Sequence, residues 1–153
     1  ELWMERFFMS RHIFFDAPYA GARSLVEKVE KVHHAGFDVV YLTGRDQERG
    51  MQGTRQCLAR HSFPLGPRTH LFLKPERTMG DMEYKERACR ILHRSFHVDV
   101  LIDNEPENLV MFAERIPEAE IVFFHSIMSQ RLPGRPYEAA LGPRKAWRLK
   151  SYF

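Results

Sequence analysis

The sequence predicts an α/β fold in which helices cover both faces of a parallel sheet, a three-layer α/β/α arrangement. Segments with helical and strand-like patterns alternate through short connections from residue 21 to about residue 125. The strand-like segments are apolar with little polar alternation, which is typical of parallel strands buried on both faces. Polar residues follow two of these strands directly, as they do where such sheets bind ligands.

Composition predicts one globular domain. The chain has 153 residues, of which 44% are hydrophobic, enough to form a sizeable core. Neither a membrane-spanning run nor a secretory leader is recognisable, so we expect no membrane partner and a soluble, cytoplasmic protein. Cys57 and Cys89 lack CxxC spacing, which argues against a disulfide framework and a zinc site. The net charge of +3 suits anionic ligands and equally an ordinary solvated surface.

The first half of the chain predicts two helices and two strands. Residues 21–36 place apolar side chains at helical spacing, with Gly36 as C-terminal cap. Residues 37–43 read as a buried strand, and residues 44–53 as a polar, glycine-rich loop. Thr54 is then expected to cap a short helix over 55–61, and residues 69–73 form the second strand.

The second half repeats this order. Asp81 is expected to cap a helix that extends to residue 96, and residues 98–102 form a buried strand. Pro106 suits the first turn of a helix that ends before Pro117. Residues 120–124 are expected to be the last strand, followed by an extended tail rich in proline and glycine.

The carboxyl ends of parallel strands converge on one edge of a sheet, so the residues there are candidates for chemistry. Thr43 offers a hydroxyl, Gly44 permits close approach of the backbone, and Arg45 offers a cation for an anion. A threonine and glycine after a strand also fit an ordinary turn. Thus this segment alone does not define a site.

A second group follows the strand over 98–102. Asp103 is followed by an oxygen-rich cluster of the kind that Mg²⁺ accepts, comprising Asn104, Glu105 and Asn108. Lys85 lies one turn after Asp81 on the preceding helix, where an ammonium group can meet a phosphate. Taken singly, Asp103 also fits a helix cap and Lys85 a solvated surface.

Together, "YLTGR", a helical lysine and "IDNEPEN" resemble motifs two, three and four of the haloacid dehalogenase (HAD) superfamily, over roughly residues 16–125. The spacing in "DMEYK" is similar to that in phosphatase domains of polynucleotide kinase-phosphatases, which favours Lys85 over Lys74 as the third motif. The resemblance implies a Rossmann-like sheet. It also implies Mg²⁺-dependent hydrolysis of a phosphate monoester through an aspartyl-phosphate.

The resemblance also implies roles for individual residues. Thr43 would donate a hydrogen bond to a phosphoryl oxygen, beside the Gly44 backbone, and Lys85 would neutralise charge on the phosphoryl group. Asp103 would hold Mg²⁺, helped by Asn104 or, in a second shell, by Asn108 and Asp81. Arg45 and Asp81 fit substrate or orienting roles and equally surface salt bridges. Many members of the superfamily have a second acid where this chain has Asn104, so Mg²⁺ binding is expected to be weaker.

The first motif of the superfamily, an apolar strand that ends in Asp-x-Asp, is absent from these residues. Asp16 has Pro18 where the second acid belongs, and proline cannot transfer a proton. Asp16 is therefore expected to precede the first helix without a chemical role. The resemblance implies that an upstream segment supplies the nucleophile and the central strand of the sheet.

This interpretation divides the chain into three parts. Residues 1–20 would be the end of a cap or insertion with its linker, residues 21–130 the HAD-like core, and residues 131–153 a basic tail. In the first part Leu2, Trp3, Phe7 and Phe8 are expected to pack on the core or cover the mouth of the site.

Two other functions remain open. One is a catalytically inactive HAD-like domain that binds phosphate or a partner. The other is binding of a nucleic-acid end, or a 3′-phosphatase-like role, through the tail, whose last eleven residues include the basic and aromatic residues Arg144, Lys145, Trp147, Arg148, Lys150 and Tyr152. The identity of the phosphorylated substrate is not predicted.

Overall fold

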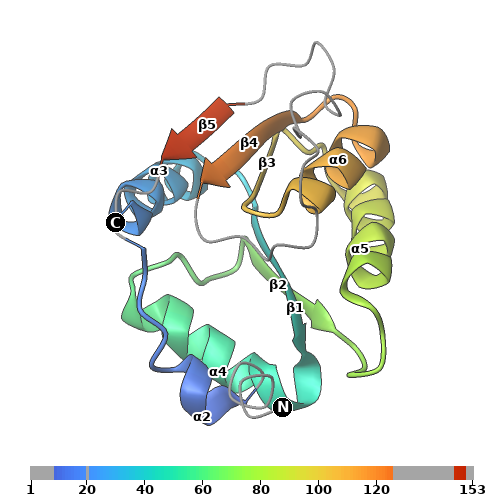
Figure 1. Ribbon diagram of the computed structural model, residues 1–153. Coiled ribbons are helices and arrows are strands. Elements are labelled where there is room, and N and C mark those ends of the chain that lie inside the picture. Colours follow the sequence, from blue (N-terminus) through green and yellow to red (C-terminus); the bar gives the residue numbers. More distant parts are fainter. Residues whose placement is uncertain (1–8, 20, 126–146, 151–153) are drawn as a thin grey trace. The chain divides into compact units, whose positions relative to one another are not determined.

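A computed structural model describes residues 9–19, 21–125 and 147–150 (Figure 1). The described chain is mixed α/β, with helices and short parallel strand pairs. It divides into two compact units, and the boundary lies between Tyr84 and Lys85. In chain order the elements are α2 (Ser10–Ile13), α3 (Ala22–His34), β1 (Val39–Asp46), α4 (Gln47–Arg60), β2 (Thr69–Lys74), α5 (Asp81–Ser95), β3 (Val100–Asp103), α6 (Pro106–Arg115), β4 (Glu120–His125) and β5 (Trp147–Lys150).

The first unit contains a two-stranded parallel sheet. The pairing of β1 with β2 runs in register from Val39 opposite Thr69 to Thr43 opposite Leu73, and then shifts so that Asp46 lies opposite Lys74. Two residues of β1, Gly44 and Arg45, therefore bulge from the ladder. Helix α4 packs on both strands, and α2 packs on α4.

The second unit contains a three-stranded parallel sheet in the order β3-β4-β5 (Figure 1). Helix α6 packs on β3 and β4. The apolar residues of α6 recur at helical spacing and form one buried face of the helix. Alternate residues of β4 pack against this face. The buried side chains of these two elements and their connection include Leu109, Phe112, Ile116, Ile121 and Phe123.

Several predicted elements are confirmed. Helix α3 buries Ala22 and Val26, and Gly36 follows it with a φ of +96°, the left-handed conformation that favours glycine at a helix end. Pro106 is in the first turn of α6, as predicted. The predicted strands over 69–73 and 120–124 correspond to β2 and β4.

The predicted loop over 44–53 and the cap at Thr54 are wrong. Helix α4 begins at Gln47, and the Asp46 carboxylate caps it by accepting a hydrogen bond from the Arg49 backbone N–H at 3.0 Å. Glycine content misled the prediction, because Gly53 lies inside this helix for close packing. A Cβ there would lie 2.5 Å from Ser10 Cα, in α2.

Three smaller expectations are also wrong. Asp81 is the first residue of α5 instead of its cap, and the Tyr84 N–H donates to the Gly80 carbonyl. Strand β3 is not buried on both faces, since Val100 and Ile102 are 48% and 41% exposed. Strand β4 is not the last strand, because β5 pairs with it in parallel within the predicted tail.

The remaining expectations for the ends of the chain concern Leu2, Trp3, Phe7, Phe8, Arg144, Lys145 and Tyr152, which lie outside the described residues. The side chains of β5 lie outside them as well. Within the part of the chain that the structure describes, no helix has the length and apolar character needed to span a bilayer.

Candidate functional site

Gly44 and Arg45, directly after Thr43, form the bulge at the carboxyl end of β1. The Arg45 backbone N–H donates a hydrogen bond of 3.3 Å to Thr43 Oγ1, which closes a tight turn around Gly44. Bulges at sheet ends commonly redirect side chains next to functional sites. The bulge therefore separates Gly44 and Arg45 from the regular ladder, directly after Thr43.

Asp16 holds the Arg45 side chain. The Arg45 Nη2 lies 2.6 Å from Asp16 Oδ2, in an ion pair whose arginine side chain is largely buried and whose aspartate is half exposed. Of the alternatives predicted for Arg45, a salt bridge is therefore the one that this contact matches. Sequence reasoning gave Asp16 no partner, because 28 residues separate it from Arg45 along the chain.

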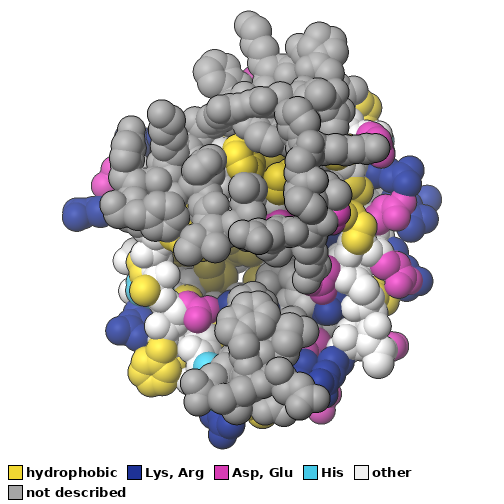
Figure 2. All heavy atoms as spheres, in the orientation of Figure 1, with side chains coloured by type: hydrophobic (Ala, Val, Ile, Leu, Met, Phe, Trp, Pro, Cys, Tyr) yellow, Lys and Arg dark blue, Asp and Glu magenta, His cyan; other side chains and the backbone are white. Residues whose placement is uncertain are grey.

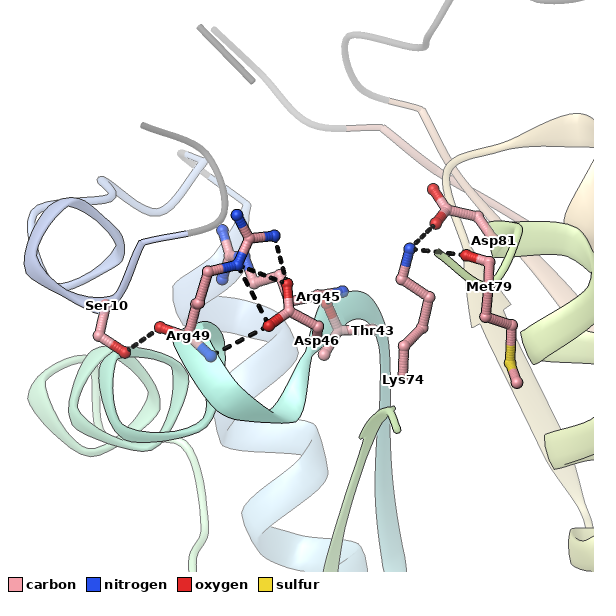
Figure 3. A network of polar contacts seen from close by, with 8 residues as sticks. All are labelled: Ser10, Thr43, Arg45, Asp46, Arg49, Lys74, Met79 and Asp81. Atoms are coloured by element: carbon pink, nitrogen blue, oxygen red, sulfur yellow. Dashed lines mark hydrogen bonds and ion pairs between the residues drawn. The ribbon is translucent and has the colours of Figure 1, made fainter. Parts of the chain in front are cut away.

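Directly after the bulge, Asp46 anchors the start of α4. Its side chain is almost fully buried and accepts hydrogen bonds from the Arg49 backbone and from its guanidinium (Figure 3). These bonds hold the pKa of the Asp46 carboxyl below its ordinary value, and the bonds from the guanidinium have the largest effect. Ser10 Oγ donates to the Arg49 carbonyl and accepts from the Gly53 N–H, so α2 is attached to the same turn.

In the second unit, Lys85 and Asp103 form a partly buried ion pair. The Lys85 Nζ lies 2.8 Å from Asp103 Oδ2, and the two side chains are 12% and 11% exposed. The buried Asn108 donates to the same oxygen at 3.0 Å. The Glu105 backbone N–H donates to Asp103 Oδ1 at 2.8 Å, which turns the chain into α6. Asp103 thus joins the end of β3 to both neighbouring helices.

The chemistry of this cluster suits Mg²⁺ only in part. Asp103 Oδ1 accepts one hydrogen bond, and a carboxylate oxygen has two lone pairs, so one remains for a metal. Asn104, half buried next in the chain, carries a further carbonyl oxygen. Among the described residues no group of three His, Cys, Asp or Glu side chains is placed to hold a metal. A single carboxylate still fits Mg²⁺, which is often bound by one or two carboxylates with water and substrate phosphate.

The predicted site residues divide between the two units. Thr43, Gly44, Arg45 and Asp81 belong to the first, while Lys85, Asp103, Asn104 and Asn108 belong to the second. Within the first unit, Asp81 lies against Gly44, and its carboxylate pairs with Lys74. Within the second, Lys85 and Asn108 meet at Asp103. The chemical roles of all eight residues remain predictions.

Sequence reasoning missed two residues of these clusters, Asp46 and the pairing role of Lys74. Each is the last residue of its strand, and Asp46 stands three residues before Arg49, the spacing of a helix cap and its first-turn partner. That spacing was a usable signal for Asp46. The buried state of Lys74 depends on Asp81, seven residues away, and has no comparable pattern.

Two other features of the described chain, a cavity and a buried thiol, offer weaker candidates for a functional site than these clusters. A cavity of about 450 Å³ beside α3 is lined by residues of mixed charge and polarity, among them Arg23, Glu27, Glu30, His61 and Phe63. The fully buried Cys89 thiol has its pKa raised to about 11 by burial, so it is a poor nucleophile near neutral pH.

The surface in Figure 2 intersperses Lys and Arg with Asp and Glu side chains, so its described part shows no broad area of one charge sign. The chain matches no family model, no curated protein and no solved structure.

Proposed function

We propose that this chain is part of a Mg²⁺-dependent phosphohydrolase that cleaves phosphate monoesters. The observation that carries the proposal is the Lys85, Asp103 and Asn108 cluster at the carboxyl end of β3. A lysine and an aspartate that are both nearly buried are uncommon on an ordinary surface. Their place after a parallel strand is where α/β proteins bind ligands.

In this proposal each group acts on the phosphoryl group. The Lys85 ammonium offsets negative charge on its oxygens, and the Thr43 hydroxyl and Gly44 backbone donate hydrogen bonds to them. Asn108 keeps Asp103 in one orientation through its hydrogen bond. Asp16 keeps Arg45 in one orientation through the ion pair.

Asp103 is the residue that would hold Mg²⁺, with Asn104 beside it and Asn108 and Asp81 as further supports. The ion, when bound, supplies positive charge against the developing charge of the phosphoryl group. Lys85 already pairs with Asp103 and repels a second cation. We therefore expect metal binding to be weak without a phosphate to draw Lys85 away.

The proposal includes a nucleophilic aspartate that these 153 residues do not supply. We propose that a preceding segment of the polypeptide contributes it on the central strand of a three-layer α/β/α sheet. Within the described residues β1 pairs with β2, and β3 pairs with β4, so each has a free edge for such a strand.

Hydrolysis of p-nitrophenyl phosphate by the full-length protein with Mg²⁺ tests the proposal. We expect turnover, and we expect Lys85→Ala to lower kcat/KM at least about 100-fold, the loss typical of one preorganised charge-stabilising donor. Arg90→Ala, an exposed cation on the same helix, is the matched control and should stay near wild type. An active protein whose Lys85→Ala variant keeps its rate would contradict the site assignment.

A second function, phosphate binding without catalysis, is favoured by the hydrogen bonds that both Asp103 oxygens already accept from their own chain. A domain of this kind would bind inorganic phosphate and show no turnover with Mg²⁺. Isothermal titration with phosphate, beside the turnover assay, separates it from the enzyme.

A further inference from the structure

The bulge at Gly44 has a neighbour that the sequence resemblance does not include. Lys74, the last residue of β2, is only 5% exposed. A buried ammonium group needs nearby acceptors, because its removal from water is otherwise strongly unfavourable. Lys74 Nζ donates to Asp81 Oδ1 at 2.7 Å and to the Met79 carbonyl at 3.1 Å (Figure 3).

Asp81 links this lysine to the bulge. A Cβ built on Gly44 would lie 3.0 Å from Asp81 Cγ and 3.1 Å from each carboxylate oxygen. The carboxylate therefore lies against the glycine backbone with no room for a side chain. About a third of the Asp81 side chain is exposed, so without the ammonium it is free to turn into water.

The register of the sheet explains why these groups meet. The two-residue bulge shifts the pairing so that Asp46, directly after Arg45, lies opposite Lys74. Lys74 is thus placed beside the end of the bulge, and the chain returns to it after the loop through Met79. The bulge, the buried lysine and the first residue of α5 form one local arrangement within the first unit.

We propose that Lys74 and Asp81 are positioning residues that hold the Gly44 backbone in place for a phosphoryl oxygen, an inference that rests on the proposed function for its ligand. Lys74 fixes Asp81, and Asp81 limits the movement of Gly44. Neither side chain touches the substrate. Gly44 itself is partly exposed, so its backbone is accessible to a ligand.

Lys74→Met tests this inference in the full-length protein. The substitution removes the charge and keeps an apolar stem, and the Asp81 carboxylate that it leaves unpaired is about a third exposed, so it can turn into water and does not stay buried without a partner. We expect an unfolding midpoint near that of wild type. We also expect the backbone order parameter of Gly44 to fall from about 0.85 to below about 0.6, while Leu71 in β2 stays rigid.

The affinity for inorganic phosphate in the presence of Mg²⁺ gives the functional readout. It should weaken at least about tenfold in Lys74→Met, the loss of one charge-assisted hydrogen bond, because a mobile Gly44 no longer presents its backbone. Asp81→Asn, which keeps the contact with Gly44 and can still accept from Lys74, should fall between this variant and wild type. Lys28→Met, an exposed lysine of α3, is the matched control.

A Gly44 that stays as ordered in folded Lys74→Met as in wild type would overturn the inference, and so would an unchanged phosphate affinity where wild type binds phosphate. If Lys74→Met does not fold, the same two readouts on Asp81→Asn decide. A wild-type protein that binds no phosphate would contradict the proposed function instead. The order parameter of Gly44 would still decide whether the pair holds the bulge.

Discussion

Asp46 shows how one buried carboxylate fixes a helix beside the candidate site. Its side chain is 3% exposed and accepts hydrogen bonds from the backbone and guanidinium of Arg49. The hydrogen bonds from the Arg49 guanidinium hold the pKa of Asp46 below its ordinary value, so the folded state favours the ionised form. The carboxylate therefore adds stability above pH 4, and this stability is lost as the pH falls through the folded value.

We predict that Asp46→Asn lowers the free energy of unfolding at pH 7 by about 1 to 2 kcal/mol, because asparagine can still cap the helix but loses the buried charge-assisted hydrogen bonds with the Arg49 guanidinium. The variant should also lose less stability than wild type between pH 7 and pH 2, because it has no carboxylate to protonate at this position. Urea unfolding at both pH values measures the two effects.

Glu48→Gln is the control for this prediction. Glu48 is an exposed acid in the same first turn of α4, so its removal should change both quantities little. Equal losses in Asp46→Asn and Glu48→Gln would show that helix charge in general matters, and the specific pairing of Asp46 with Arg49 would be contradicted.

At the scale of elements, the contact between α2 and α4 depends on a glycine. Gly53→Ala in an open helix would stabilise the protein by up to about 1 kcal/mol. Here the added Cβ would lie 2.5 Å from Ser10 backbone atoms, so we predict a loss of at least about 1 kcal/mol from overpacking. Thermal unfolding of Gly53→Ala shows whether the substitution lowers or raises stability. Gln52→Ala, at an exposed neighbouring position, is the control. A stabilised Gly53→Ala would contradict this packing.

Elements with a local signal were predictable, and those fixed by distant contacts were not. Helix α3 follows from its apolar spacing and Gly36, and α6 from Pro106. Helix α4 was predicted too short because Gly50 and Gly53 resemble loop residues, whereas in the structure Gly50 lies against Arg45 and Gly53 against Ser10 of α2. Strand β3 looked buried from its apolar run, whereas burial depends on what covers Val100 and Ile102.

For the molecule as a whole, the sequence predicted which strand ends carry polar groups, and the structure adds their partners. The pair between Lys85 and Asp103 joins residues 18 apart, and the spacing alone did not reveal it. The ion pair between Asp16 and Arg45 and the buried Lys74 are likewise products of tertiary structure. The division into two units at Tyr84 had no signal in composition.

The central proposal is that Asp103, at the end of β3, binds the Mg²⁺ ion that phosphate-monoester hydrolysis requires. The most direct measurement is the rate of p-nitrophenyl phosphate hydrolysis by the full-length protein over a series of Mg²⁺ concentrations, for wild type, Asp103→Asn and Asp99→Asn. Asp99 is an exposed acid just before the same strand and is the matched control.

We predict Mg²⁺-dependent turnover in wild type and Asp99→Asn. In Asp103→Asn the rate should be lost, or the Mg²⁺ concentration for half-maximal rate should rise at least about tenfold. An Asp103→Asn protein with the rate and Mg²⁺ dependence of wild type would contradict the claim.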